Sequence, residues 1–444
     1  MTAATTHSRH WPCRRRTRPA SAAGARGFAT TRTLLGCLLL ATAGSAWAAM
    51  VATPLELPGQ AEPSVVAGPD DGYVLTWIDR VDGGARLSYA QLDARGAVQR
   101  QGRIAEGKDW FVNWADFPSL VILDNGDWLT FVLRKSDPAA PYAYDIWTTR
   151  SRDQGRSWSA LALLHDDGTR TEHGFVALLP DGGDRALAIW YDGRLGAGAM
   201  DHDATAGHEM EGRMTLRGAV LTRDAAPAEA LQLDDMTCSC CTTDALRTAR
   251  GPLVAYRDRT PGELRDIAWI TRSGSAWTAP RAVHADGWVI AGCPVNGPAL
   301  ALAGTRPVVA WPTFGDGSYR VRVARREGEG WSQPLELEAG AGVMGRVDAA
   351  AWGDDGALVS WLGGPDGQVV LRVARLDAGL VESERITVAT LPPGRMTGMP
   401  RMASHGDAAI LVWTSPEARG GKVRGVLLRA GGGEARASDT AGRQ

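Results

Sequence analysis

The sequence predicts an all-β fold, a β-propeller of four-stranded blades, with seven as the expected number of blades and six as the alternative. The main observation is a repeat: a short apolar strand that ends in an aromatic residue recurs seven times, 50 to 66 residues apart. This spacing suits one four-stranded blade per copy, and self-similarity at such a period is typical of repeat architectures. The seven copies are residues 73–77, 128–131, 186–190, 253–256, 308–311, 358–361 and 410–413.

Each copy is embedded in the same order of elements. A short strand such as 118–122 precedes the aromatic strand, and an alternating strand such as 145–149 follows it. A Gly-containing turn and an outer strand that begins at Trp complete the unit. Because the aromatic positions recur with the blades, we expect many of the 17 Trp residues to pack between sheets rather than to bind a ligand.

The two ends of the repeat region complement each other. The seventh copy lacks an outer strand of its own, since Gly, Ala and Ser dominate the chain after Leu428. Residues 53–57, Thr-Pro-Leu-Glu-Leu, closely match the outer strand of the fifth copy at 333–337, Gln-Pro-Leu-Glu-Leu. An open sheet edge invites pairing with other chains. We therefore predict that 53–57 completes the last blade and closes the ring.

One turn carries a motif that points to a family. Residues 151–158, Ser-Arg-Asp-Gln-Gly-Arg-Ser-Trp, fit the Asp-box pattern S-x-D-x-G-x-x-W. In such a hairpin the Asp side chain caps turn N–H groups and Gly adopts a conformation closed to other residues. This motif and the repeats, over residues 50–430, resemble the sialidase-like (BNR, Asp-box repeat) β-propeller superfamily. The resemblance implies that the Asp box lies on the outer rim and that ligands bind at the central face.

The catalytic residues of family sialidases are not matched. The family carries Arg-Ile-Pro at the mouth of an early blade, and the corresponding segments here are 61–64, Ala-Glu-Pro-Ser, and 116–119, Asp-Phe-Pro-Ser. Neither has the Arg that would grip a substrate carboxylate at two points. The family's nucleophilic Tyr belongs to a late blade, but the last Tyr in this chain is Tyr319. We therefore expect no sialic-acid hydrolysis, and whether the protein is an enzyme stays open.

The first 48 residues have the features of a secretory signal peptide with a basic leader. They hold seven Arg and no acid, followed by an apolar run at 34–43 and by Ala46-Trp47-Ala48, a small-x-small cleavage site. The apolar run is too short to span a bilayer stably. We expect cleavage near Ala48, a propeller at 49–430, a flexible tail at 431–444, and a periplasmic or secreted protein.

The net charge of the chain limits the classes of partner that we expect it to bind. The whole chain has a formal net charge of −2, and removing the seven leader Arg leaves −9. No basic stripe with interleaved aromatic residues remains, so nucleic acid is not an expected partner. No later segment is apolar enough to cross a membrane, so we expect no span in the mature chain. The expected partners are a small-molecule, glycan or metal ligand, or another exported protein.

The four cysteines outside the leader are the strongest functional signal. Cys238, Cys240 and Cys241 precede the first strand of the fourth copy, and Cys293 precedes that of the fifth. First strands line the channel, so these loops should meet at the central mouth. Two structural disulfides are one interpretation, natural in an oxidising compartment. The other is a thiolate site for Cu(I) or Zn(II), towards copper if Met396, Met399 and Met402 contribute. Catalytic redox chemistry is a third, weakened by the spacing.

Other polar residues occupy loops that should open onto the same face. His202 and His208, in an acidic insertion, are weaker metal candidates than the cysteines. The Arg-Asp-Arg run at 257–259 can clamp an anion or form ion pairs between blades. The residues expected to bind ligand are His173, Asp192, Arg194, Asp244, Arg257, Asp258, Arg259, Asn296, Arg346 and Arg401.

These observations leave three hypotheses open. The first is a protein that binds or handles a soft metal such as copper through its four cysteines. The second is a glycan-active hydrolase or lectin that uses His173, Asp192, Arg194, Arg257 and Asp258. The third is an interaction scaffold whose cysteines form structural disulfides.

Overall fold

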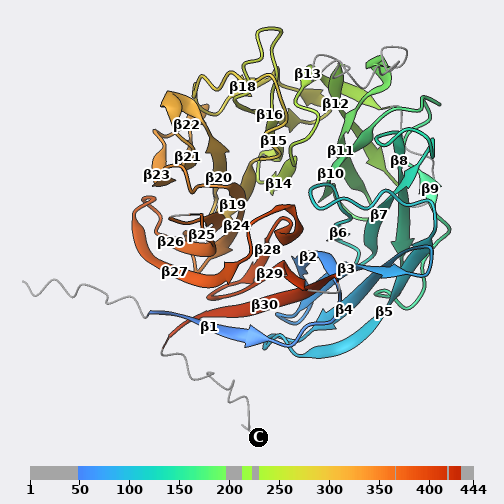
Figure 1. Ribbon diagram of the computed structural model, residues 1–444, viewed down its shortest axis with the longest axis horizontal. Helices are drawn as coiled ribbons and strands as arrows, with labels where there is room; N and C mark the ends of the chain where they lie inside the picture. Colours follow the sequence, from blue (N-terminus) through green and yellow to red (C-terminus); the bar gives the residue numbers. More distant parts are fainter. Residues whose placement is uncertain (1–48, 197–212, 223–229, 366, 418–419, 432–444) are drawn as a thin grey trace, which may run out of the picture. The chain divides into compact units, whose positions relative to one another are not determined.

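The computed structural model describes residues 49–196, 213–222, 230–365, 367–417 and 420–431, all of them in one compact unit, residues 47–444. Their strands form seven antiparallel sheets arranged in a ring (Figure 1). The prediction of a β-propeller is therefore confirmed, with seven blades and not the six of the alternative. Within the described part of the chain, none of the helices has the length and apolarity needed to cross a bilayer.

The strands follow the order that the repeat predicts. Blade 1 consists of β2 Ala61–Ala67, β3 Tyr73–Val81, β4 Gly84–Leu92 and β5 Val98–Gly107. Blade 2 consists of β6 Leu120–Ile122, β7 Trp128–Lys135, β8 Tyr144–Ser151 and β9 Ala162–Leu163. Blade 3 consists of β10 His173–Pro180, β11 Ala186–Asp192, β12 Met214–Leu221 and β13 Leu231–Thr237. Blade 4 consists of β14 Asp244–Thr248, β15 Gly251–Arg257, β16 Ile267–Ser273, β17 Ala276–Trp277 and β18 Arg281–Ala282.

Blades 5 to 7 complete the ring. Blade 5 consists of β19 Ala299–Ala303, β20 Arg306–Thr313, β21 Arg320–Glu327, β22 Gly330–Trp331 and β23 Leu335–Ala339. Blade 6 consists of β24 Gly345–Trp352, β25 Gly356–Gly363, β26 Val369–Leu376 and β27 Glu382–Leu391. Blade 7 consists of β28 Arg401–His405, β29 Ala408–Glu417, β30 Gly420–Ala430 and β1 Met50–Leu55. In blades 4 and 5 the outer strand is split into two short segments. Among the described residues, three short 3₁₀ helices lie in loops, η1 Arg194–Gly196, η2 Gly315–Gly317 and η3 Arg395–Thr397.

The N-terminal strand closes the ring. β1 pairs antiparallel with β30, with Met50 opposite Ala430 and Leu55 opposite Gly425. Figure 1 shows this blue strand beside the red C-terminal strand of the same blade. The predicted closure is confirmed, although the strand spans 50–55 rather than 53–57. Leu57 lies beyond the strand and packs in an apolar cluster with residues of blades 1 and 7.

The aromatic residues of the second strands pack between neighbouring blades. Trp190 of blade 3 lies among Phe131 and Ile146 of blade 2, and Trp361 of blade 6 lies among side chains of blade 5. Both indole rings are fully buried. The buried Nε1–H of Trp190 donates to Asp192 at 2.9 Å, so its polar group is satisfied. The recurrent aromatic residues therefore hold neighbouring blades together.

The Asp-box hairpin joins β8 to β9. The Ser157 N–H donates to Asp153 Oδ1 at 2.8 Å, and the Gly155 N–H donates to Ser151 Oγ at 2.7 Å. Gly155 has a φ of 88°, and a Cβ there would come within 3 Å of the Tyr89 and Trp128 rings. The glycine is required both by the left-handed backbone and by this close packing.

Bulges in first strands shape the central mouth. The pairing of β2, β10 and β24 with their neighbours shifts register near the start of each strand. The residue at each shift has a left-handed backbone: Glu62 at φ 47°, Phe175 at 53° and Arg346 at 51°. Such a conformation is uncommon outside glycine and is typical of bulges near functional rims.

Candidate functional site

The structure brings the cysteines of two blades together. Cys238, Cys240 and Cys241 lie in the loop between β13 and β14, and their three Sγ atoms are all within 4.8 Å of one another. Cys238 Sγ is 3.8 Å from Cys240 Sγ and 3.4 Å from Cys241 Sγ. Cys293, from the segment between β18 and β19, forms a hydrogen bond with Cys240. All four are free thiols, and we call them the thiol cluster.

Exposure differs across the thiol cluster. Cys238 and Cys241 are fully buried, Cys240 is partly buried, and Cys293 is exposed. Cys240 packs against an apolar cluster to which Met399 belongs. The cluster therefore has a closed inner side and one thiol that meets solvent.

Polar groups from two neighbouring loops, before β16 and before β19, hold the inner sulfurs. Arg265 is 1% exposed, and its Nη1 donates to Cys238 Sγ at 3.3 Å. The Asn296 N–H donates to Cys241 Sγ at 3.4 Å. Two N–H donors aimed at sulfur favour thiolate over thiol, because they stabilise the charged form.

The pKa values of the three thiols in this loop shift in different directions. Burial opposes ionisation of Cys238, but hydrogen bonds from Cys240 and Cys241 and the charge of Arg265 outweigh it, so its pKa is well below the usual range. The hydrogen bond to Cys238 raises the pKa of Cys240, and burial raises that of Cys241. Cys238 is therefore the thiol of the group that ionises most readily.

The predicted ligand residue Arg257 is placed between blades. Its guanidinium is fully buried and donates to the backbone carbonyls of Asn296 at 2.7 and 2.9 Å, Arg265 at 2.6 Å and Pro312 at 2.8 Å. It also stacks over Trp288, 4.6 Å from the ring centroid. In this position Arg257 links blades 4 and 5 and supports the loops that carry the thiol cluster.

Its two neighbours in the sequence are engaged locally. Arg259 forms an ion pair with Glu263 at 2.7 Å, within one loop. Burial, with the nearby charge of Asp234, raises the pKa of Asp258 to about 7. The three residues therefore do not form one clamp.

His173, Asp192 and Arg194 belong to a separate buried network. Asp192 accepts two hydrogen bonds from Arg194, both at 2.7 Å. His173 is fully buried, and its ring stacks on His165 with centroids 3.8 Å apart and planes 17° apart. Asp167 lies 2.6 Å from His165 Nδ1 and 3.3 Å from His173 Nε2.

The two stacked histidines of this network are not placed to bind one metal ion together. Asp145, His165 and His173 each offer a ligand atom within 4.8 Å of the others. A metal lies in the plane of an imidazole that binds it, and one ion cannot lie in two nearly parallel planes. Burial lowers the pKa of His173, but Asp167 and the other carboxylates outweigh it and raise the pKa overall. The sequence interpretation missed His165, Asp145 and Asp167, because only the pairing of blades 2 and 3 brings them to His173.

The remaining predicted residues join neighbouring blades around the central mouth. Asp244 Oδ2 accepts the Leu300 N–H at 2.7 Å, and Asn296 Oδ1 accepts the Arg346 N–H at 2.8 Å. Arg401 lies 3.8 Å from Asp348. Burial lowers the pKa of Arg346 to about 10.

Some expected residues cannot be placed. His202 and His208 lie outside the described residues, as do the basic leader and the tail.

A scan against protein-family models found no match, and a search of curated proteins found none either. The solved structures to which the chain is similar include a PL25 ulvan lyase, at 11% identity over 72% of this chain and 79% of that one, with a TM-score of 0.46. A Penicillium chrysogenum α-L-arabinanase has 12% identity over 86% and 98%, with a TM-score of 0.44. The NanB sialidase of Streptococcus pneumoniae has 9% identity over 81% and 83%, with a TM-score of 0.45. In fold, as its own blades show, this chain is a seven-bladed β-propeller.

Proposed function

We propose that the protein binds a soft metal ion, Cu(I) or Zn(II), at the thiol cluster. The observation that supports this most directly is that three thiols of one loop lie within 4.8 Å of one another, with Cys293 of the next loop beside Cys240. Thiolates are the ligands that these two ions prefer. A role in handling the metal, by uptake from or transfer to another protein, extends the same proposal.

The sulfur spacing suits such an ion. Sulfurs placed tetrahedrally about 2.3 Å from zinc lie roughly 3.8 Å apart. Cys238 Sγ is 3.8 Å from Cys240 Sγ and 3.4 Å from Cys241 Sγ, so only a small outward movement is needed. Metal ligands in a preformed loop of this kind cost little to order.

The electrostatics also suit a cation. Cys238 is already the thiolate, held by Arg265, so one ligand needs no deprotonation. Cys240 and Cys241 must each lose a proton when the metal binds. Since their pKa values are raised, metal affinity should increase with pH through the neutral and alkaline range.

Cys293 provides access to the buried thiols. It is exposed and hydrogen-bonded to Cys240, which is itself only partly buried. An incoming ion can therefore bind Cys293 first and pass to Cys240 by ligand exchange. Met399, in the apolar cluster beside Cys240, adds a thioether that favours copper.

The test is a competition titration of the reduced protein, without its leader, against chromogenic chelators for Cu(I) and Zn(II). We expect one ion per chain, and we expect Cys241→Ser to weaken binding by at least about tenfold, since a ligand is lost. Cys293→Ser should slow metal uptake more than it weakens final affinity. Ser239→Ala, in the same loop, is the matched control and should change neither.

Two outcomes would overturn the proposal. One is a protein that takes up neither ion stoichiometrically when reduced. The other is a metal-free protein whose cysteines are all disulfide-bonded when isolated from an oxidising compartment and whose stability falls when Cys241 is replaced. The second result would establish the structural-disulfide interpretation.

A further inference from the structure

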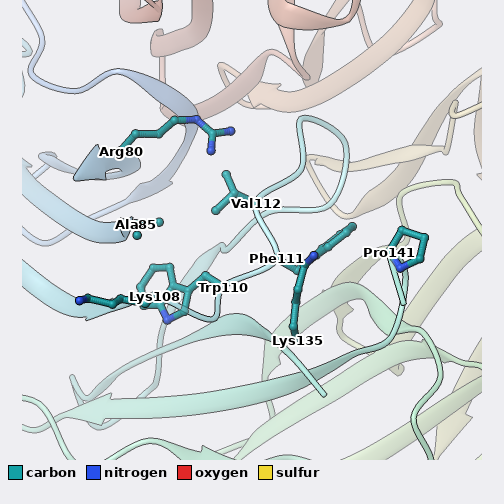
Figure 2. Close-up of a pocket in the computed structure, with 9 residues that line it drawn as sticks. Arg80, Ala85, Lys108, Trp110, Phe111, Val112, Lys135 and Pro141 are labelled. Atoms are coloured by element: carbon teal, nitrogen blue, oxygen red, sulfur yellow. The ribbon is translucent and has the colours of Figure 1, made fainter. Parts of the chain in front are cut away.

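A cavity of about 420 Å³ opens between blades 1 and 2, and no residue of the thiol cluster lines it. Arg80 lies near the end of β3, Lys135 ends β7, and residues 108–112 follow β5. These are loops before a first strand or after a second strand, the same kind that carries the thiol cluster. Figure 2 shows side chains of both blades around this pocket.

The pocket is lined by three cationic side chains, Arg80, Lys108 and Lys135. The chain has only three lysines, so two of them stand here. Within the residues that the structure describes, none of these three cations forms an ion pair. Three positive charges around one cavity attract an anion.

The acids close to this pocket are engaged elsewhere. Asp109 pairs with Arg134 at 2.6 Å, and Glu106 pairs with Arg86 at 2.8 Å. Glu62 lies near Arg80, but burial raises the pKa of its carboxyl to about 7 despite that charge. These three acids therefore offset the positive charge of the pocket only in part.

Rings form the rest of the wall. Trp110 is 9% exposed, and Phe111 stacks on the buried Tyr144 with centroids 3.9 Å apart and planes 8° apart. Pro141 lines the cavity opposite Phe111 in Figure 2. Fixed rings of this kind pack against the apolar face of a cyclic ligand, and cations beside them orient its polar groups.

We propose that this basic pocket, lined by Arg80, Lys108, Lys135, Trp110 and Phe111, binds a saccharide that carries a carboxylate or sulfate group. The volume lies in the range of small-ligand sites and suits one or two sugar rings. The cations supply charge-assisted hydrogen bonds to the anionic group. The net charge of −9 expected for the mature chain repels long polyanions outside the pocket, which favours a short ligand.

Calorimetric titration with three probes tests this site. The probes are digalacturonate, a sulfated galactose disaccharide, and neutral galactobiose. We expect at least one acidic probe to bind, about tenfold or more tightly than galactobiose, because charged hydrogen bonds contribute about 1.5–3 kcal/mol each. Which acidic probe binds distinguishes carboxylate from sulfate recognition.

Variants of the pocket test whether the acidic probe binds there. Arg80→Gln and Lys135→Gln should each weaken the acidic probe by about tenfold. Lys422→Gln removes the same charge on β30 and should have no effect. Thermal melts of all three variants establish that the fold is kept.

The proposal is overturned if neither acidic probe gives saturable binding, if galactobiose binds equally well, or if Lys422→Gln weakens binding as much as Lys135→Gln. It does not depend on the proposed metal site. Lys135→Gln should leave Cu(I) and Zn(II) affinity unchanged, so each proposal can fail alone.

Discussion

Among single residues, Arg265 acts most directly on the charge of the thiol cluster. Its guanidinium is buried, donates to Cys238 Sγ at 3.3 Å, and pairs with Glu263 at 2.8 Å on its other edge. Glu263 therefore orients a cation whose field keeps Cys238 ionised. The sequence offered no signal for this role, because Arg265 reaches the cysteine from a different loop, between β15 and β16.

Replacing Arg265 by Met should raise the pKa of Cys238. One more proton must then leave when a metal binds near neutral pH, so we expect Zn(II) affinity to drop about tenfold there. The loss should shrink as pH rises and all thiols ionise. Chelator competition across a pH series measures this. Arg259→Met, which also removes a partner of Glu263, is the control. A loss independent of pH would contradict the assignment.

At the scale of elements, β1 joins the two ends of the chain region that forms the ring. It pairs with β30 along six residues and supplies the outer strand of blade 7. The Met50 N–H also donates to Glu384 of blade 6, at 2.8 and 2.9 Å to its two oxygens. β1 therefore pairs with the otherwise open edge of β30 and also connects blade 7 to blade 6.

Deleting residues 50–55 should expose the edge of β30. We expect Tm to fall by at least about 4 °C, since a few kcal/mol of burial and hydrogen bonding are lost. The exposed edge should also promote association. Thermal melts and size-exclusion chromatography measure both effects. Removing 432–444, beyond β30, is the control. An unchanged Tm with a monomeric elution volume would show that closure contributes little.

Across the whole molecule, buried carboxyl groups surround the centre of the ring. Burial raises the pKa of Glu62, Asp116 and Asp348 to about 7 each. Because these groups are protonated in the folded state at pH values where they are ionised in the unfolded chain, folding binds protons. Their contribution to stability is therefore complete below about pH 4 and is lost as pH rises to about 7.

Replacing Asp348 by Asn should remove part of this pH dependence. We expect the variant to melt a few degrees above the wild type at alkaline pH, and the difference to vanish near pH 4. Thermal melts over this pH range provide the measurement. Asp354→Asn, an exposed carboxyl of the same blade, is the control and should show no such trend. A difference in Tm between variant and wild type that grows as the pH falls would have the opposite pH dependence and would contradict this account.

At the central mouth, the two early-blade segments differ from the sialidase motif. Ala61 and Asp116 stand where the family's early-blade motif would have Arg. The buried Tyr144 hydroxyl donates to Asp116 at 2.7 Å and Glu172 at 3.0 Å, and burial raises its pKa well above the usual range. A protonated, buried phenol is a weak nucleophile. We expect no turnover of a fluorogenic sialoside; turnover abolished by Tyr144→Phe would contradict this.

The sequence by itself determined the architecture. The seven aromatic strands marked seven blades, and the likeness of 53–57 to 333–337 located the closing strand. Such features follow from short-range patterns: alternation along a strand, turn residues, and the size of a ring that must fit between sheets. Loops that begin first strands share one face, so the sequence also predicted which loops would converge.

Only the tertiary structure decided what each polar side chain does there. Arg257 is buried against carbonyls, His173 stacks on His165, and Arg265 holds Cys238. Two lysines and Arg80 line a basic pocket that no motif marks. The physical reason is that burial, and therefore charge and hydrogen bonding, depends on the neighbouring blade, which no local pattern specifies.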